Sequence, residues 1–180
     1  MDIVPFILKW EGGLSNDKAD SASANPCPTS HDGHTGYHTN KGVTYAVWAH
    51  YFGKNNDSRF FTMSDEDWGV IFKAGYWDKV KGDLIESQAI ANCMVSWAWG
   101  SGAARAIKLI QEVVGVDIDG KLGQQTIGAI NSMDEVELFD KCIARRKRFF
   151  EDIAKARPAN LKFLKGWMNR LNDFNKTFHP

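Results

Sequence analysis

Short amphipathic helical segments follow one another along nearly the whole chain of 180 residues. Apolar residues recur in them every three or four positions, as in helices with one buried face. Glycines stand where runs end, at Gly12-Gly13, Gly53 and Gly115, which is typical of helix C-caps. Strand-like alternation is nearly absent. The sequence therefore predicts an all-α protein with a small β-hairpin or loop insertion after the first helix.

Residues that favour helix N-termini precede several of these runs. Thr44, Ser64 and Ser87 each begin one, and Ser132 with Glu135 forms a capping-box pattern that opens a long one. In that long helix we expect an inward apolar row of Val136, Phe139, Ile143, Phe150 and Ile153. The remaining predicted helices cover 103–114, 124–131 and a last segment with Leu161, Leu164, Trp167 and Leu171.

Composition places the chain among globular proteins, with 43% hydrophobic and 24% charged residues. Twenty-two basic residues balance 22 acidic ones, so the basic excess typical of nucleic-acid and membrane-surface binders is missing. No apolar run reaches the roughly 20 residues of a membrane span. We expect a monomer that forms one compact unit, with a soft boundary near Gly100 between regions 1–100 and 101–180.

The N-terminus bears on export, and the cysteines bear on metal binding and disulfide formation. The N-terminus has no basic start, so no signal peptide is predicted and the export route stays open. The three cysteines are widely spaced, which favours neither a zinc ribbon nor a disulfide framework.

Glu11 is the first candidate catalytic residue. On a helical wheel it falls inside the apolar arc, between Ile7 and Val4. It also stands in the predicted last turn, where backbone carbonyls present negative charge. Both placements disfavour the ionised carboxylate, and a carboxylic acid kept protonated is what a general acid requires. The alternative is that Glu11 turns to the edge of the arc and meets water or an arginine.

Two segments of the first half carry a resemblance to a known family. They are Trp10-Glu11-Gly12-Gly13 and the run from His38 to Thr44, HTNKGVT. Together they resemble the glycoside hydrolase family 108 muramidases, lysozyme-like proteins of phages and bacteria, some of which are described as secretion activators. In the second half, 106–111, 119–123 and Thr126 are similar to the family's C-terminal region, usually called a peptidoglycan-binding domain.

The resemblance implies a lysozyme-like helical fold, with a catalytic region over 1–100 and a peptidoglycan-binding-like region over 101–180. It implies cleavage of the bond between N-acetylmuramic acid and N-acetylglucosamine in peptidoglycan glycan strands, at the cell wall or in the periplasm. Glu11 would protonate the departing sugar oxygen. No cofactor is expected.

Glycosidases generally need a second carboxylate. Asp20 lies nine residues after Glu11, as the second acid does in phage-type lysozymes, and is preferred for that reason. Eighteen residues, 21–38, separate Asp20 from Thr39, where many relatives have almost none. Because of this insertion Asp32 remains an alternative, as does Asp17. Each of these aspartates is otherwise a solvated turn residue.

The predicted substrate-binding set consists of polar and aromatic residues around the second motif, namely Tyr37, Thr39, Asn40 and Thr44. Asn40 and Thr44 are suited to bind an N-acetyl group or the attacking water, and Tyr37 to stack on a sugar ring. The structural alternatives are a turn for Asn40, an N-cap for Thr44 and hairpin packing for Tyr37.

Two rival hypotheses remain. Cys27, His31, His34 and His38, with Asp32 among them, lie within twelve residues and are of the types that bind zinc. Their spacing matches no standard zinc pattern, so we expect no metal. The other rival is a peptidoglycan-binding or secretion-linked protein without catalysis.

Two further motifs predict local structure rather than a functional site. The basic run Arg145–Arg148 is expected on a solvated helix face, and Asp119-Gly120 in a turn between helices.

Overall fold

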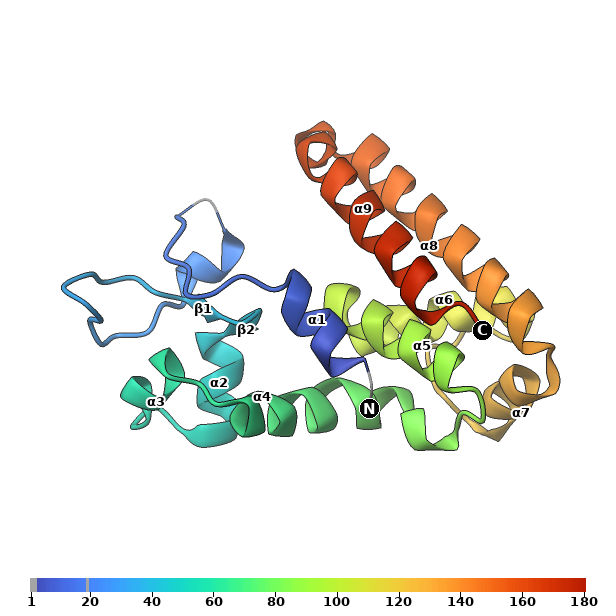
Figure 1. Cartoon of the computed structure of the whole chain (residues 1–180), viewed down its shortest axis with the longest axis horizontal. Coiled ribbons are helices and arrows are strands. Elements are labelled where there is room, and N and C mark those ends of the chain that lie inside the picture. The colour runs from blue at the N-terminus through green and yellow to red at the C-terminus, as the bar shows by residue number, and fades with distance from the viewer. Residues whose placement is uncertain (1–2, 19) are drawn as a thin grey trace. The chain divides into compact units, whose positions relative to one another are not determined.

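The structure is a computed structural model, and it describes residues 3–18 and 20–180, except for the side chain of Ser21. It is mostly helical, and its described residues include a two-stranded antiparallel sheet (Figure 1). The chain divides into two compact units, Met1–Gly75 and Tyr76–Pro180. The predicted all-α class with a small hairpin is confirmed. Among the described residues, no helix is both long enough and apolar enough to span a membrane.

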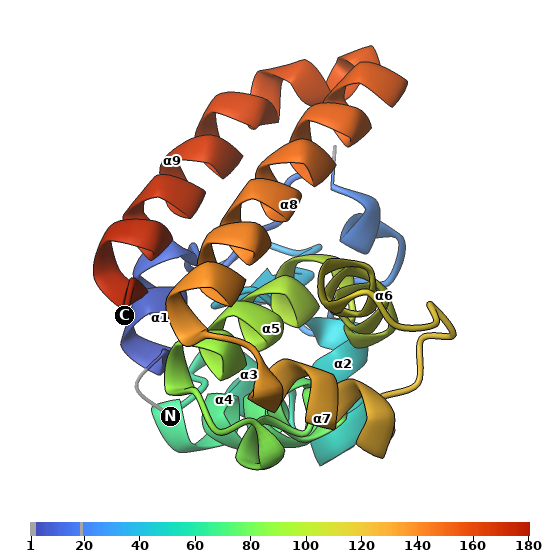
Figure 2. The same ribbon diagram turned by 90° about the vertical axis from the view of Figure 1, so that its right-hand side faces the viewer.

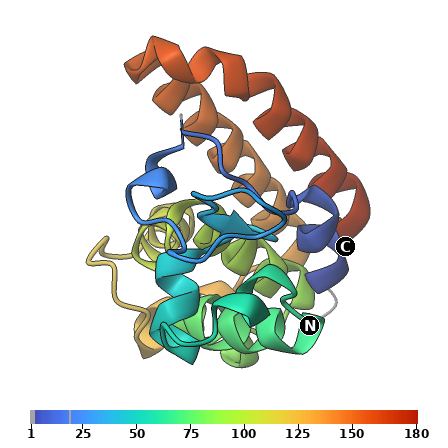
Figure 3. The ribbon, with the colours of Figure 1, turned by 90° about the vertical axis from the view of Figure 1, so that its left-hand side faces the viewer.

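The first unit begins with helix α1 (Val4–Trp10) and a long irregular segment that includes the short 3₁₀ turn η1 (Ser21–Ala24). The hairpin of β1 (Thr39–Asn40) and β2 (Val43–Thr44) follows and runs directly into α2 (Tyr45–Phe52) (Figure 3). Lys41 and Gly42 have φ values of 47° and 76°, as the central residues of a tight hairpin turn require.

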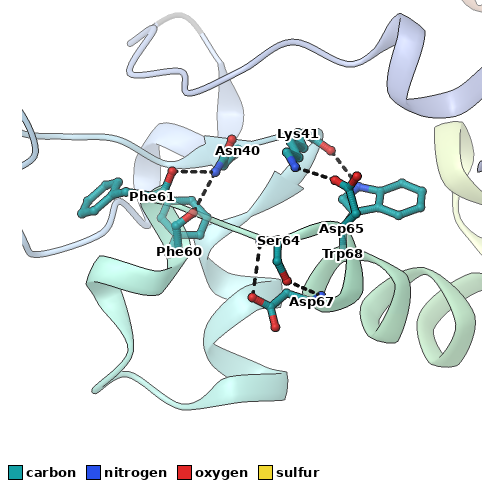
Figure 4. Close-up of polar contacts among 8 residues, drawn as sticks. All are labelled: Asn40, Lys41, Phe60, Phe61, Ser64, Asp65, Asp67 and Trp68. Atoms are coloured by element: carbon teal, nitrogen blue, oxygen red, sulfur yellow. Dashed lines mark hydrogen bonds and ion pairs between the residues drawn. The ribbon is translucent and has the colours of Figure 1, made fainter. Parts of the chain in front are cut away.

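Helices α3 (Asp57–Phe61) and α4 (Asp65–Phe72) complete the first unit. Its core is aromatic, because Trp48, Phe60, Trp68 and Phe72 are all fully buried. Two N-terminal caps are as predicted. Thr44 Oγ1 accepts from the Val47 N–H, and Ser64 forms a capping box with Asp67 (Figure 4).

The second unit includes the short turns η3 (Asp78–Val80) and η4 (Gly82–Leu84) and continues in helix α5 (Gln88–Ser101), whose residues 90–98 are all buried. It then forms α6 (Ala103–Val114), α7 (Gln124–Ser132), α8 (Glu135–Ala156), the turn η5 (Pro158–Asn160) and α9 (Leu161–Phe178). Helices α8 and α9 lie side by side over much of their length (Figure 2).

Most second-unit predictions are confirmed. Ser87 caps α5, and α6 has the predicted bounds. Asp119 Oδ1 accepts from the Lys121 N–H in the predicted turn, where Gly120 has a φ of 75°. The two structural units meet along the chain between Gly75 and Tyr76. The predicted functional division, with a catalytic region up to residue 100 and a binding region after it, stays a prediction.

Three details at α8 differ from the predictions. Asp134, not Ser132, caps the helix, because its carboxylate accepts from the Glu137 N–H at 2.9 Å. Val136, expected inward, is 42% exposed in the first turn. The basic run is solvated only in part, because Lys147 and Arg148 are exposed but Arg146 is buried and donates to Ser96.

Candidate active site

Glu11 stands directly after α1 rather than within its last turn. Its backbone N–H still donates to Ile7 O at 3.1 Å, but its φ and ψ of −91° and 139° are extended. Glu11 itself therefore ends the helix, ahead of the glycines expected to do so. Because the extended backbone turns the residue off the helical path, its half-buried position is not the one that the helical wheel predicts.

A pocket of about 470 Å³ in the first unit includes Glu11 in its wall. We call it the Glu11 pocket. Four of the six predicted site residues line it, namely Glu11, Asp20, Thr39 and Thr44. Ala22, Asn25, Gly42 and Ala46 complete the lining. The pocket therefore joins the end of α1, the turn η1 and the hairpin.

The hairpin is fixed beside the segment that follows Glu11. Ser15 N donates to Thr39 O at 2.9 Å, and His38 N donates to Ser15 O at 2.9 Å. The His38 ring is fully buried, with Nε2 3.1 Å from Asp17 O and Nδ1 2.9 Å from Thr39 Oγ1. His38 thus anchors the segment 15–17 to β1. The sequence places His38 in the rival zinc set and does not predict this anchoring role.

Asp20 begins η1 as its N-cap. Its Oδ1 accepts from the Ala22 N–H at 2.9 Å, and the residue is exposed. Asp32, by contrast, lies outside the lining of the Glu11 pocket, and its side chain is 81% exposed beside His31. Asp17 is also absent from that lining. Of the three candidate aspartates, Asp20 is the one that lines the Glu11 pocket.

Thr39 and Thr44 face each other across the hairpin as register partners. Thr44 Oγ1 accepts from Val47 N at 3.3 Å, so its N-cap alternative is correct. The hydroxyl keeps its proton as a donor while it caps the helix. Both threonines are half-buried, and both line the Glu11 pocket.

Asn40 and Tyr37 are not in the lining. Asn40 is 5% exposed, and its Nδ2 donates to Phe60 O at 2.7 Å and to Phe61 O at 3.3 Å (Figure 4). Tyr37 packs edge-on against Phe61, with ring centroids 5.9 Å apart. The contact of Tyr37 fits its packing alternative. Asn40 lies in strand β1 rather than in the turn that was its structural alternative, and its amide is bound to the backbone of the first unit itself.

Two more contacts fasten the hairpin turn to α4. Trp68 Nε1 donates to Lys41 O at 3.0 Å, and Lys41 Nζ pairs with Asp65 Oδ1 at 2.8 Å (Figure 4). Together with the bonds of the Asn40 amide, these two contacts hold strands β1 and β2, which carry Thr39 and Thr44, against α3 and α4. The hairpin wall of the Glu11 pocket therefore rests on α3 and α4.

Asn40→Ala is expected to destabilise the first unit by about 1 to 3 kcal/mol, because it leaves the buried carbonyls of Phe60 and Phe61 without their donor. Chemical denaturation of the variant measures this loss. The exposed Asn55 gives the matched control, since Asn55→Ala removes an amide that bonds to nothing buried. Unchanged stability of Asn40→Ala with weaker substrate binding would instead assign Asn40 to the substrate.

The histidine-rich insertion does not gather its side chains. The His31 ring stacks on Phe61 at 4.5 Å, and His31 pairs with His34 through backbone hydrogen bonds of 2.9 Å. Cys27 is buried, and this burial raises the pKa of its thiol. Within 3–18 and 20–180, no three His, Cys, Asp or Glu residues are grouped so that they could hold a metal ion. The geometry gives the zinc hypothesis no support.

The insertion instead contributes to a second pocket of about 530 Å³. Its lining includes Pro26, Pro28, Tyr45, His50 and Lys54, and it shares Asn25 and Ala46 with the Glu11 pocket. Tyr45 in its wall donates to Asp57 Oδ1 at 2.6 Å. Burial and this carboxylate raise the pKa of Tyr45 above its usual range. No sequence pattern indicates this pocket, apart from the extended backbone that paired prolines favour.

Comparisons with known proteins match the two parts of the chain separately. A family model described as Glycosyl hydrolase 108 matches residues 4–102, which is more than half of the chain. A second model, described as a predicted peptidoglycan domain, matches residues 105–172. Among solved structures, the chain is similar to SagA of Brucella abortus, with 26% identity and a TM-score of 0.76 over 97% of this chain and 90% of that chain. No curated protein sequence matches.

Proposed function

The chain belongs to the glycosyl hydrolase 108 family, and from that premise we propose that it is a muramidase. It cleaves the glycan strands of peptidoglycan between N-acetylmuramic acid and N-acetylglucosamine. The match of residues 105–172 to a peptidoglycan domain supports this choice of polymer. The observation that carries the proposal is the Glu11 pocket, in which Glu11 and Asp20 share one cavity wall.

The two carboxyl groups have different surroundings, as glycoside hydrolysis requires. Glu11 is half-buried and Asp20 is exposed. In the proposal, the Glu11 carboxylic acid protonates the leaving sugar oxygen. The Asp20 carboxylate stabilises the positive charge that develops on the sugar ring, and it either activates water or attacks the anomeric carbon itself. The Thr39 and Thr44 hydroxyls bind substituents of the sugar.

The substrate is a polymer, so a single pocket accommodates only part of it. The second pocket continues the wall of the Glu11 pocket through Asn25 and Ala46. Tyr45, His50 and Lys54 supply an aromatic ring and hydrogen-bonding groups there, the combination that binds sugar rings. We infer that neighbouring saccharides of the glycan strand occupy this second pocket.

A second candidate function is peptidoglycan binding without cleavage, which the match of residues 105–172 also favours. One experiment separates the candidates. The purified protein is incubated with dye-labelled sacculi, with and without EDTA, and both bound protein and released dye are measured. We expect dye release that EDTA does not change, because protonation by a carboxylic acid needs no metal. Binding without release supports the second candidate, and release abolished by EDTA contradicts both.

A further inference from the structure

The second unit contains a cavity of about 220 Å³ between α5, α6, α8 and α9. Three arginines line it, Arg105, Arg146 and Arg170, together with the aromatic rings of Phe149, Phe150 and Trp167. All six belong to the region that matches the peptidoglycan domain. We call this cavity the arginine pocket. Helices α8 and α9, which run side by side in Figure 2, carry five of these six residues.

Arg146 is the buried member, with 7% of its surface exposed. Its Nη1 donates to Ser96 Oγ at 3.1 Å and its Nη2 to Ser96 O at 3.0 Å. Its guanidinium also lies over the Phe150 ring, 5.4 Å from the centroid. Both acceptors are uncharged. Among the described residues, no carboxylate forms an ion pair with Arg146.

Burial lowers the pKa of Arg146 to about 9, and the nearby Arg170 adds to this lowering. The guanidinium is therefore still a cation at neutral pH. A buried cation without an anion is costly to the fold. Two of its five N–H groups are used by Ser96, so others are left to bind a ligand.

Arg105 adds a second cation at the mouth of the pocket. It is exposed, and its guanidinium lies 5.7 Å from the centroid of the Phe149 ring. It takes part in no ion pair within the described residues. Arg145, the neighbour of Arg146 on α8, differs because it pairs with Glu112 at 2.9 Å. Arg105 and Arg146 thus bring two positive charges to one pocket in a chain whose net charge is zero.

We propose that the arginine pocket binds the terminal carboxylate of a peptidoglycan peptide stem, with Arg146 as its main contact. The choice of ligand rests on the proposed function. A guanidinium matches a carboxylate with two parallel hydrogen bonds, and the aromatic walls suit the methyl groups of D-alanine. A cavity of about 220 Å³ has room for such a small terminal residue. A lactyl carboxylate on peptide-free muramic acid offers the same chemistry from another source.

Calorimetric titration of the full chain tests the inference with three probes that contain no glycosidic bond to cut. They are the stem pentapeptide ending in D-Ala-D-Ala, the same peptide as its C-terminal amide, and N-acetylmuramic acid. We expect the free acid to bind on the order of tenfold more tightly than the amide, and more tightly than N-acetylmuramic acid. Equal binding of acid and amide, or tighter binding of N-acetylmuramic acid, would overturn the assignment to the stem.

Variants then locate the site. Arg146→Lys keeps the charge but loses the planar fork, and Arg105→Met removes an exposed cation without touching the core. Each is expected to weaken binding of the free acid about tenfold. Arg148→Met, an exposed change on the same helix, is the matched control and should bind as wild type does. Circular dichroism verifies that Arg146→Lys folds. If Arg105→Met and a folded Arg146→Lys both bind the free acid as tightly as the wild type does, the arginine pocket is not the binding site.

Peptide binding and glycan cleavage are measured separately, so the arginine pocket and the muramidase activity are tested independently. Cleavage of peptide-free glycan strands by the wild-type protein tests the muramidase proposal in the absence of any peptide stem. Cleavage with no binding of the pentapeptide leaves the muramidase proposal intact and overturns this inference. Pentapeptide binding without any cleavage supports the arginine pocket and contradicts the muramidase proposal.

Discussion

Glu11→Gln is expected to lower the rate of peptidoglycan cleavage by about 10²- to 10⁴-fold, because the amide has no proton to give to the leaving sugar oxygen. The change keeps the size and shape of the side chain. Glu11 is a half-buried residue after α1, and its backbone bond to Ile7 O does not depend on the side chain. The fold should therefore persist, with a melting temperature close to that of the wild type.

Dye release from labelled sacculi, measured with equal amounts of folded protein, gives the rate for this variant. Glu66→Gln is the matched control, because Glu66 is an exposed residue in the first turn of α4 and outside the Glu11 pocket. We expect it to cleave as the wild type does. Wild-type activity of Glu11→Gln would show that another group is the acid.

Asp20→Asn should reduce cleavage by a comparable factor, on the order of 10²-fold or more. The neutral amide neither stabilises the positive sugar ring nor acts as base or nucleophile. An asparagine also caps a turn as well as aspartate does, so the contact to the Ala22 N–H should survive and η1 should keep its shape. A loss of activity in this variant then reports chemistry rather than folding.

Asp32→Asn is the control that decides between the two aspartates. Asp32 belongs to the same irregular segment but lies outside the Glu11 pocket. Its φ of 49° is one that asparagine also tolerates. We expect nearly wild-type dye release from this variant. An inactive Asp32→Asn beside an active Asp20→Asn would move the second carboxylate into the insertion.

The elements that sequence predicts well are those specified by neighbours along the chain. Thr44, Ser64 and Ser87 each accept from an N–H three residues later, so the residue type and its spacing are enough to find them. Helix α6 ends at a glycine with a φ of 74°, another local signal. At α8 two cap residues compete within three positions. Asp134 caps it because Ser132 still belongs to α7.

The features that sequence missed depend on partners far along the chain. Arg146 looks like part of a solvated basic run, yet it is bound to Ser96, 50 residues away. Asn40 looks like a ligand for substrate, and its donors go to carbonyls 20 and 21 residues later. Sequence spacing does not encode such distant pairs. The family resemblance suggested Glu11, and the spacing of phage-type lysozymes suggested Asp20, and these two residues line one pocket. The second pocket beside it takes part of its lining, Asn25, Pro26 and Pro28, from the insertion, which lies outside the family's motifs.

The most direct test of the central claim is mass spectrometry of the soluble products that the protein releases from purified peptidoglycan, after reduction with borohydride. The proposed cleavage predicts fragments whose reduced end is N-acetylmuramitol, formed by the wild type and missing from the Glu11→Gln digest. Fragments that end in reduced N-acetylglucosamine, or peptides released without any new reducing end, would contradict it.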